Sequence, residues 1–482
     1  MRTAHLLSKS TYIRGQQCQK SLYLNKKRPF LRDKISPEQL AKFKRGTDVG
    51  ILAQSLFPGG VDCKPKSPAQ YVAKIAETAS MMTKPDVHTI YEAVFQWDEV
   101  LIILDILVRH NTGWHAYEVK SSVRISETYL QDAALQYYVL TGSGVKLHDF
   151  SMIHLDADYV FQEKLELHKL FKTVSVLEEV QQRFDETGAN IRISKTTLEA
   201  DSSPKIPIGP WCHSPYPCDF IGHCWKHVPA NSFLYLDTIS EEERFEWHRA
   251  GLLNICDLPD NFGEEASSRI QAKAFKTGKI CFETEQIDSV LQLLNARDGS
   301  ESYVFVLAHS PAIPLLSGAR PFESIPLAIC ILSRDRTFIH HHLATSESMR
   351  KFAVCLAEIS RKGMIFTDDS LALEGLYHFA CKYTESSELA YLPRMELAVV
   401  GLQQLISGLK IYFPVPMKDT SLNDRALWLS GRDFKLKNET FLVRELTQAE
   451  TEPSFADSLQ QLMLFPEALK AAFDGIGTLK IS

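Results

Sequence analysis

Apolar and polar residues alternate along residues 88–97, as expected for a strand with one buried face. A nearly continuous apolar run follows over residues 100–108 and is interrupted only by Asp105. A turn at residues 111–113 then leads into a second β-type segment. The pattern predicts a β-hairpin whose first strand carries one isolated acidic residue.

The rest of the chain alternates between helical and strand patterns. Residues 1–60 are expected to be largely helical, a strand is predicted near residues 146–156, and a long amphipathic helix is predicted over about residues 160–187. Residues 230–295 are polar and helical in character, and a second set of apolar strand patterns begins near residue 300. This succession predicts an α/β protein with two α/β regions.

Three charged residues are expected to meet on one face of the hairpin. Side chains of a strand repeat every second residue, so Glu118 and Lys120 share a face, and Asp105 lies opposite them. Two carboxylates, with a backbone carbonyl and waters, form the oxygen ligand set that Mg2+ or Mn2+ prefers. Such a metal would polarise a phosphodiester and activate a water, while Lys120 would hold that water or stabilise the developing charge.

An ordinary hairpin is the alternative, in which Asp105 and Glu118 are solvated or paired and Lys120 is a surface ion-pair partner. Triplets of this kind are common by chance. The apolar surroundings of Asp105 favour the metal site, because an isolated charge in such a run is costly unless it binds something.

The helix that follows the hairpin adds further polar residues. Asp132 and Gln136 are one turn apart on one face, with Tyr137 and Tyr138 adjacent. With the hairpin, this region resembles the RecB-like branch of the PD-(D/E)XK nucleases, although the usual Gln-x-x-x-Tyr spacing differs here. The resemblance implies a restriction-endonuclease-like mixed sheet flanked by helices. The residues that it makes catalytic are Asp105, Glu118, Lys120, Gln136 and Tyr137.

Other charged residues near the hairpin extend the expected site. Glu92, in the strand beside the hairpin, is either a third metal ligand with Asp105 and Glu118 or an edge-strand charge. The net charge is −6, so a nucleic-acid-binding surface has to be local, and residues 14–45 are strongly basic. A solvated helical surface is the alternative for this basic run. The expected contacts to nucleic acid are Lys26, Lys27, Arg28 and Arg124.

Four of the 10 cysteines follow a pattern. Cys212, Cys218 and Cys224 are evenly spaced in a proline-rich segment, and Cys18 is the expected fourth ligand. One cysteine before the core and three after it resemble the iron-sulfur staple of AddB-type helicase-nucleases and CRISPR-associated RecB-like exonucleases. The resemblance implies a 4Fe-4S cluster. Zinc stays open as the alternative, since it also accepts four thiolates.

Short sequence phrases point to a narrower relative. LSKSTYIRGQQC, EVKSS and PYPC resemble a bacterial family in which a RecB-like nuclease domain precedes an RNase H-like domain of the DEDDh exonuclease type. The resemblance implies a nuclease domain at residues 1–229, a helical connector at 230–295 and an RNase H-like α/β domain at 296–482. Active members carry Asp-x-Glu where this chain has Phe305 and Leu307, so we expect the second domain to lack catalysis.

These expectations favour a metal-dependent DNA nuclease, acting as an exonuclease, that uses a Mg2+- or Mn2+-activated water. A non-catalytic scaffold that binds nucleic acid or a partner protein is the alternative. A third possibility places exonuclease activity in the second domain, through Asp368, Asp369 and Glu396. The sequence has no G-x-x-x-x-G-K-S/T motif, so unwinding would need a helicase partner. DNA repair and phage defence both use such chemistry.

Composition is that of a soluble globular protein, with 45% hydrophobic and 23% charged residues. The N-terminal residues contain no sustained apolar segment, and no stretch approaches the ~20 apolar residues of a membrane span. We therefore expect a cytoplasmic protein that does not enter a membrane.

Overall fold

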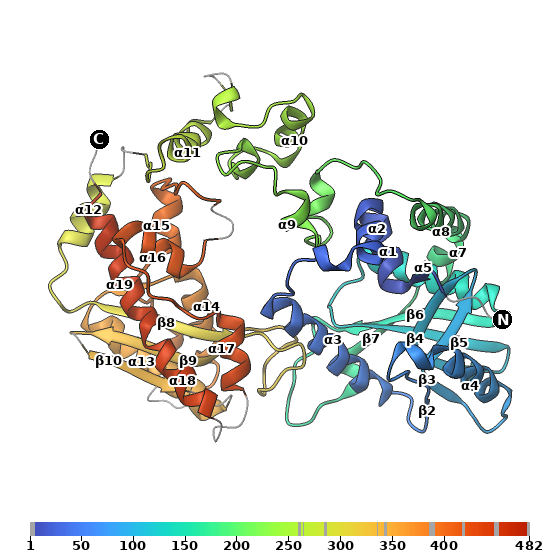
Figure 1. Cartoon of the computed structure of the whole chain (residues 1–482). Coiled ribbons are helices and arrows are strands. Elements are labelled where there is room, and N and C mark those ends of the chain that lie inside the picture. The colour runs from blue at the N-terminus through green and yellow to red at the C-terminus, as the bar shows by residue number, and fades with distance from the viewer. Residues whose placement is uncertain are drawn as a thin grey trace. The chain divides into compact units, whose positions relative to one another are not determined.

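The computed structural model describes residues 5–258, 262–263, 265–283, 287–334, 336–341, 345–384, 391–416, 420–447 and 453–479. The chain forms two compact units, which are described separately (Figure 1). The first comprises Met1–His227, Ala312–Pro314 and Ala319–Pro321, and the second comprises Val228–Pro311, Leu315–Gly318 and Phe322–Ser482. The division into three regions at residues 229 and 295 stays a prediction.

A seven-stranded mixed sheet forms the centre of the first unit. Its strands are β1 (Leu7–Ser8), β2 (Val61–Asp62), β3 (Thr89–Trp97), β4 (Val100–His110), β5 (Gly113–Lys120), β6 (Leu147–Leu155) and β7 (Phe171–Ser175). The order is β2-β3-β4-β5-β6-β7, and β1 pairs with β4. Neighbours in β3-β4-β5 and β6-β7 are antiparallel, whereas β2-β3, β1-β4 and β5-β6 are parallel.

Helices flank this sheet and complete its core. They are α1 (Lys9–Gln17), α2 (Gln19–Lys27), α3 (Pro37–Gln54), α4 (Tyr71–Thr83), α5 (Glu127–Gly142), α6 (Leu167–Leu170), α7 (Leu177–Gln182), α8 (Phe184–Glu199) and α9 (Ile221–Cys224). Helix α5 begins where the Ser126 side chain accepts the N–H of Tyr129. Its buried face, including Leu135 and Val139, packs with strand residues such as Ile102. This packing fixes α5 beside the hairpin.

The predicted hairpin is present as β4 and β5. The apolar run of β4 is almost wholly buried, as expected for a strand covered on both faces of its sheet. The predicted helix over residues 160–187 is wrong, because β7 lies inside this range and pairs with β6. Thr173 and Val174 are β-branched residues that fit an extended edge strand better than a helix.

A five-stranded mixed sheet forms the centre of the second unit. Its strands are β8 (Ser302–His309), β9 (Ile325–Ser333), β10 (Arg336–His341), β11 (Ile365–Thr367) and β12 (Val399–Gly401). The order is β10-β9-β8-β11-β12. The first two pairings, β10-β9 and β9-β8, are antiparallel, and the other two are parallel.

The second unit also contains helices, several of which pack on its sheet. They are α10 (Glu241–Arg249), α11 (Ala266–Thr277), α12 (Ile287–Asn295), α13 (Ser346–Lys362), α14 (Ser370–Cys381), α15 (Leu402–Gly408), α16 (Leu422–Ser430), α17 (Glu439–Leu446), α18 (Pro453–Leu462) and α19 (Leu464–Gly477). Two α/β regions with mixed sheets flanked by helices confirm the coarser part of the predicted fold class, whereas the restriction-endonuclease-like and RNase H-like identities of the two sheets stay predictions. None of the helices in the described ranges combines the length and apolar character needed to cross a membrane.

Candidate functional site

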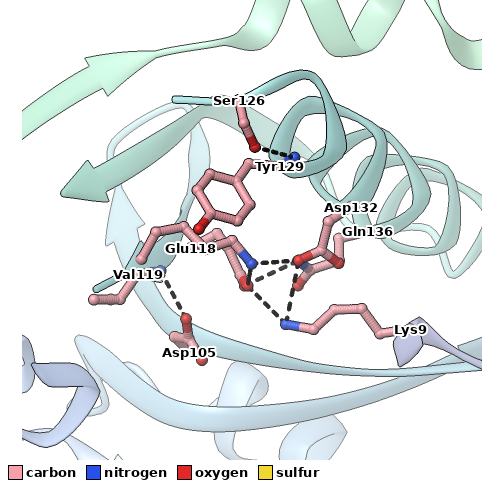
Figure 2. Close-up of polar contacts among 9 residues, drawn as sticks. Lys9, Asp105, Glu118, Val119, Ser126, Tyr129, Asp132 and Gln136 are labelled. Carbon is pink, nitrogen blue, oxygen red and sulfur yellow. Dashed lines mark hydrogen bonds and ion pairs between the residues drawn. The ribbon is translucent and has the colours of Figure 1, made fainter. Parts of the chain in front are cut away.

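Glu118 is the centre of a buried ionic network on the sheet of the first unit (Figure 2). It is only 1% exposed. Its Oε1 accepts hydrogen bonds from Lys120 Nζ and Lys9 Nζ, each at 2.7 Å, and its Oε2 accepts one from Gln136 Nε2 at 2.9 Å. These three donors come from β5, α1 and α5, so tertiary packing fixes the orientation of the carboxylate.

Lys120 lies between two carboxylates. Its ammonium group hydrogen-bonds to Asp132 Oδ2 on α5 as well as to Glu118. Lys9 Nζ lies 3.8 Å from the same Asp132 oxygen. The ring of Tyr129 is also on α5, with its centroid 5.1 Å from Lys120 Nζ. The catalytic lysine predicted from the sequence is therefore held by groups from the helix as well as from its own strand.

Asp105 occupies the neighbouring strand β4, where its Oδ2 accepts the backbone N–H of Val119 at 2.7 Å (Figure 2). No lysine or arginine of the described residues forms an ion pair with it. Burial, and secondly the carboxylate of Glu118, raise the pKa of Asp105 to about 7. Asp105 is thus a half-buried carboxyl group that forms no ion pair among the described residues, although the ammonium groups of Lys9 and Lys120 partly offset the rise in its pKa.

The lysines act on Glu118 in the opposite direction. Burial alone would raise the pKa of Glu118, but the ammonium groups of Lys120 and Lys9 lower it below its usual range. Burial alone would lower the pKa of Lys120, but Asp132 and Glu118 raise it. The network contains three carboxyl groups and two ammonium groups. When all five groups are ionised, the network has a net charge of −1.

Two oxygens of this network have no hydrogen-bond partner among the described residues. They are the buried Asp132 Oδ1 and Gln136 Oε1. Buried polar atoms are normally satisfied, so an additional ligand or water is expected beside them. Asp105 and Glu118 fit Mg2+ or Mn2+, because Mg2+ commonly takes one or two carboxylates and keeps several waters. Within the described ranges, no group of three or more His, Cys, Asp or Glu side chains is arranged to hold a metal ion unaided.

The other predicted site residues have different positions. The carboxylate of Glu92 binds Lys64 Nζ at 2.9 Å, and its backbone has a φ of 52° that interrupts the β3-β4 pairing opposite Asp105. Tyr137 packs edge-on against Phe184, with ring centroids 6.1 Å apart. The structure does not bring either side chain onto Glu118; Tyr129 is the tyrosine beside the lysine.

Four functional candidates were not selected from the sequence. They are Lys9, Tyr129, Asp132 and Tyr216. Helical spacing already placed Asp132 on the face of Gln136, although without a role, and the same spacing could have found Tyr129, which precedes Gln136 by seven residues. Lys9 and Tyr216 belong to distant segments, and no local pattern connects them to the hairpin.

The four patterned cysteines line one cavity in the first unit. Cys18, Cys212, Cys218 and Cys224 surround it together with Trp211 and apolar side chains. Cys18 ends α1 and is the N-cap of α2, and the backbone amides of Ser21 and Lys20 are near enough to its sulfur to influence the pKa of the thiol. Burial raises the pKa of the Cys18 thiol, and these amides partly offset the rise. All ten cysteines are free thiols.

This donor set fits a 4Fe-4S cluster, in which each iron takes one thiolate and the ligands therefore surround a cavity. A single zinc ion needs all four sulfurs at about 2.3 Å. The described residues contain no cysteine group drawn together around one such ion. Four thiolates are a ligand set that both a 4Fe-4S cluster and zinc accept.

Ion pairs tie the N-terminal helices to the cysteine segment. Arg14 Nη2 lies 2.6 Å from Asp219 Oδ2, and Asp33 Oδ2 accepts the N–H of Gly222 at 3.0 Å. Phe220 is fully buried against Tyr23 and Leu24 of α2. Segments about 200 residues apart thus form one structural element around the cavity.

The predicted nucleic-acid contacts are on the surface of the first unit. Lys26, Lys27 and Arg28 are exposed at the end of α2, and Arg124 is exposed in the loop after β5. Burial is the main cause that lowers the pKa of His223, which adjoins Cys224, and nearby cationic residues lower it further. These residues are Lys226, Lys20, Arg28 and His227. A basic surface therefore borders the cysteine cavity.

The second unit holds its acidic residues differently. Asp368 Oδ2 accepts hydrogen bonds from Arg425 at 2.8 Å and Gln403 at 2.9 Å. Asp369 caps the N-terminus of α14. Phe305 and Leu307 are buried in the core, where Phe305 stacks on Phe465 at a centroid distance of 4.0 Å.

Comparison with known proteins adds no family to this description. The chain matches no protein-family model, and no curated protein matches it either. The functional argument therefore rests on the residues and their geometry.

Proposed function

We propose that this protein is a metal-dependent DNA nuclease of the PD-(D/E)XK class, of the RecB-like type and acting as an exonuclease. The observation that carries the proposal is the arrangement of Asp105, Glu118 and Lys120. The buried carboxyl group of Glu118 and the half-buried one of Asp105 lie on adjacent strands, and the lysine follows Glu118 by two residues. Such an arrangement provides both an oxygen ligand pair and a positioned cation.

Each residue of the network has a role in this proposal. Asp105 and Glu118 would hold Mg2+ or Mn2+, which when bound polarises the phosphodiester and lowers the pKa of a bound water. Lys120 orients that water and stabilises charge that develops on the phosphate. Asp132 keeps the Lys120 ammonium at its place, and Gln136 keeps Glu118 turned toward it. Glu92 and Tyr137 have no assigned role in this arrangement.

The remainder of the first unit would bind and support the substrate. Cys18, Cys212, Cys218 and Cys224 would hold a 4Fe-4S cluster that links the N-terminal helices to the segment after the core. Lys26, Lys27, Arg28 and Arg124 would contact DNA phosphates without reading sequence. A helicase or another repair or defence protein would supply unwinding where the substrate is duplex DNA.

The second unit would be an RNase H-like domain without catalytic activity. Its strand order and strand directions support that proposal. Phe305 and Leu307 leave no ligand oxygens on β8, and Arg425 neutralises Asp368. The unit would then serve in DNA binding or assembly.

Cleavage assays test the nuclease proposal directly. The protein is purified without oxygen and incubated with end-labelled single- and double-stranded DNA and Mg2+ or Mn2+. We expect cleavage by the parent and at least a 1000-fold slower reaction by Lys120→Ala, about 4 kcal/mol of lost transition-state stabilisation. Absence of cleavage by a folded, iron-loaded parent on every DNA would contradict the proposal.

A non-catalytic scaffold is the second candidate. It is favoured by the closed state of the network, in which both Glu118 oxygens already accept hydrogen bonds from the chain. A scaffold would bind DNA with equal affinity in the parent and in Asp105→Ala, with or without Mg2+. A nuclease would cleave DNA in its parent form and would not cleave it as Asp105→Ala.

A further inference from the structure

The loop between Cys212 and Cys218 brings a tyrosine to the nuclease site. Tyr216 lies close enough to Tyr129, whose ring lies beside the Lys120 ammonium, for Tyr129 to influence the pKa of Tyr216. Lys120 and Asp132 are close enough to Tyr216 to influence its pKa, which burial and Tyr129 raise. Tyr216 is nevertheless 47% exposed. One part of its ring therefore adjoins the site, and another part is open to solvent.

The backbone of this loop is fixed by the residue that precedes the first cysteine. Gln17 Nε2 donates hydrogen bonds to the carbonyls of Trp211 at 2.8 Å and Tyr216 at 2.6 Å. The N–H of Cys218 donates to the carbonyl of Cys212 at 2.9 Å and closes the loop. Gln17 is the last residue of α1, and Lys9, which contacts Glu118, is the first. One short helix thus connects the cysteine cavity with the carboxylate network.

We propose that Tyr216 positions the substrate by stacking on an unpaired nucleobase next to the phosphate at Lys120. This proposal rests on the proposed nuclease function and assigns single-stranded DNA, or the frayed end of a duplex, as the substrate. An exposed aromatic ring held beside a cation suits this role, because every base has a π-face that stacks irrespective of sequence. Bases inside a duplex are already stacked on their neighbours and cannot stack on the Tyr216 ring.

The cysteine ligands give this positioning a dependence on the cluster. Cys212 and Cys218 bound the loop that carries Tyr216, so loss of their common ligand leaves the loop held only by the hydrogen bonds of Gln17 and of the Cys218 N–H. The Tyr216 ring would then leave Tyr129. We therefore expect loss of the cluster and loss of the Tyr216 ring to have the same effect, because each removes the contact between Tyr216 and the base.

Binding measurements with the full chain test the proposal independently of cleavage. Fluorescence anisotropy is recorded with fluorescein-labelled oligothymidine of about 16 nucleotides, and with a blunt duplex of equal length, in Ca2+. The proteins compared are the parent, Tyr216→Ala and Tyr216→Phe. Tyr391→Ala is the matched control, because Tyr391 is an exposed tyrosine of the second unit. Far-ultraviolet circular dichroism and iron content verify that each protein is folded and loaded.

For Tyr216→Ala we expect about a tenfold higher Kd for the single strand and little change for the duplex. Tyr216→Phe keeps the ring and should stay within about threefold of the parent. An unchanged Kd of Tyr216→Ala for the single strand, or an equal loss on the duplex, would overturn the proposal.

The cluster is then removed by chelation and the measurements are repeated. We expect the apoprotein to bind the single strand about tenfold more weakly, and Tyr216→Ala to add no further loss. Additive losses would overturn the link to the cluster. If the parent shows the Tyr216-dependent binding but does not cleave in Mg2+, the nuclease function fails and the base contact stands. If the parent cleaves and Tyr216→Ala binds normally, the base contact alone fails.

Discussion

Lys9 is the residue that most changes the chemistry expected from the hairpin. Its ammonium group reaches Glu118 across 109 residues of sequence and shares that carboxylate with Lys120. Two cations beside Glu118 keep it ionised, and Lys9 also lies 3.8 Å from the Asp132 oxygen that Lys120 contacts. We infer that Lys9 leaves Lys120 free enough to move toward a substrate phosphate.

Replacement of Lys9 by methionine should slow cleavage without unfolding the protein. Without the Lys9 ammonium, both Glu118 and Asp132 would bind only Lys120. The two carboxylates would then hold the Lys120 ammonium away from the substrate. A displacement of this kind costs on the order of 100-fold in rate. Single-turnover cleavage of end-labelled DNA in Mg2+ measures the effect.

Lys195→Met provides the control for this experiment, because Lys195 also forms short ion pairs, with Asp98 at 2.5 Å and Glu99 at 3.2 Å. Its loss should alter stability but leave the cleavage rate within about twofold of the parent. A Lys9→Met protein that cleaves as fast as the Lys195→Met control would show that Lys9 has only a structural role.

The core of the site could be predicted because it is local. Asp105, Glu118 and Lys120 follow from strand periodicity and a single hairpin turn. Tyr137 was selected by its adjacency to Gln136, but successive helix residues are about 100° apart, so it faces Phe184 instead. Tyr129 lies on the same helix face as Asp132 and Gln136. The contact of Lys9 requires the packing of α1 against the sheet, which no local pattern contains.

At the scale of elements, the junction of α1 and α2 is where the cysteine cavity meets the network. Cys18 is the residue at this junction, where it ends α1 and caps the N-terminus of α2. Sequence spacing was sufficient to group Cys212, Cys218 and Cys224. It could not show that the same helix α1 ends in Gln17, which binds the cysteine loop, and begins in Lys9.

Substitution of Cys18 by alanine should remove the cluster. We expect loss of the broad visible absorption and of most of the iron, from about four atoms per chain in the parent, together with a lower midpoint of thermal unfolding. Iron and acid-labile sulfide assays, with a thermal scan, measure these changes. Cys256→Ala is the control, because Cys256 is exposed in the second unit and should retain full iron content. A parent that contains one zinc ion and no iron would contradict the assignment.

The whole molecule contains two α/β units whose acidic residues are used in opposite ways. In the first unit, Asp105 lies in an apolar strand and has no cation partner among the described residues. In the second, Asp368 Oδ2 is paired with Arg425 while its Oδ1 has no hydrogen-bond partner among the described residues, and Phe305 is buried in the core. The α/β character of the second unit was evident from its apolar strands. The order β10-β9-β8-β11-β12 was not, because pairing between distant strands is decided by tertiary packing.

This contrast predicts that Asp368 supports the stability of the second unit but not cleavage. Asp368→Asn keeps the size of the side chain but leaves the guanidinium of Arg425, which is 12% exposed, without its carboxylate. Removal of one partner of such a pair should lower the free energy of unfolding by about 2 kcal/mol. Asp369→Ala, which removes a helix cap, should cost about 1 kcal/mol. Chemical denaturation measures both losses, and single-turnover assays should give the parental cleavage rate for each protein. If Asp368→Asn stops cleavage while Asp369→Ala does not, and both remain folded, the acidic group of the second unit takes part in the reaction, and the catalytic site has to be assigned there instead of to Asp105 and Glu118.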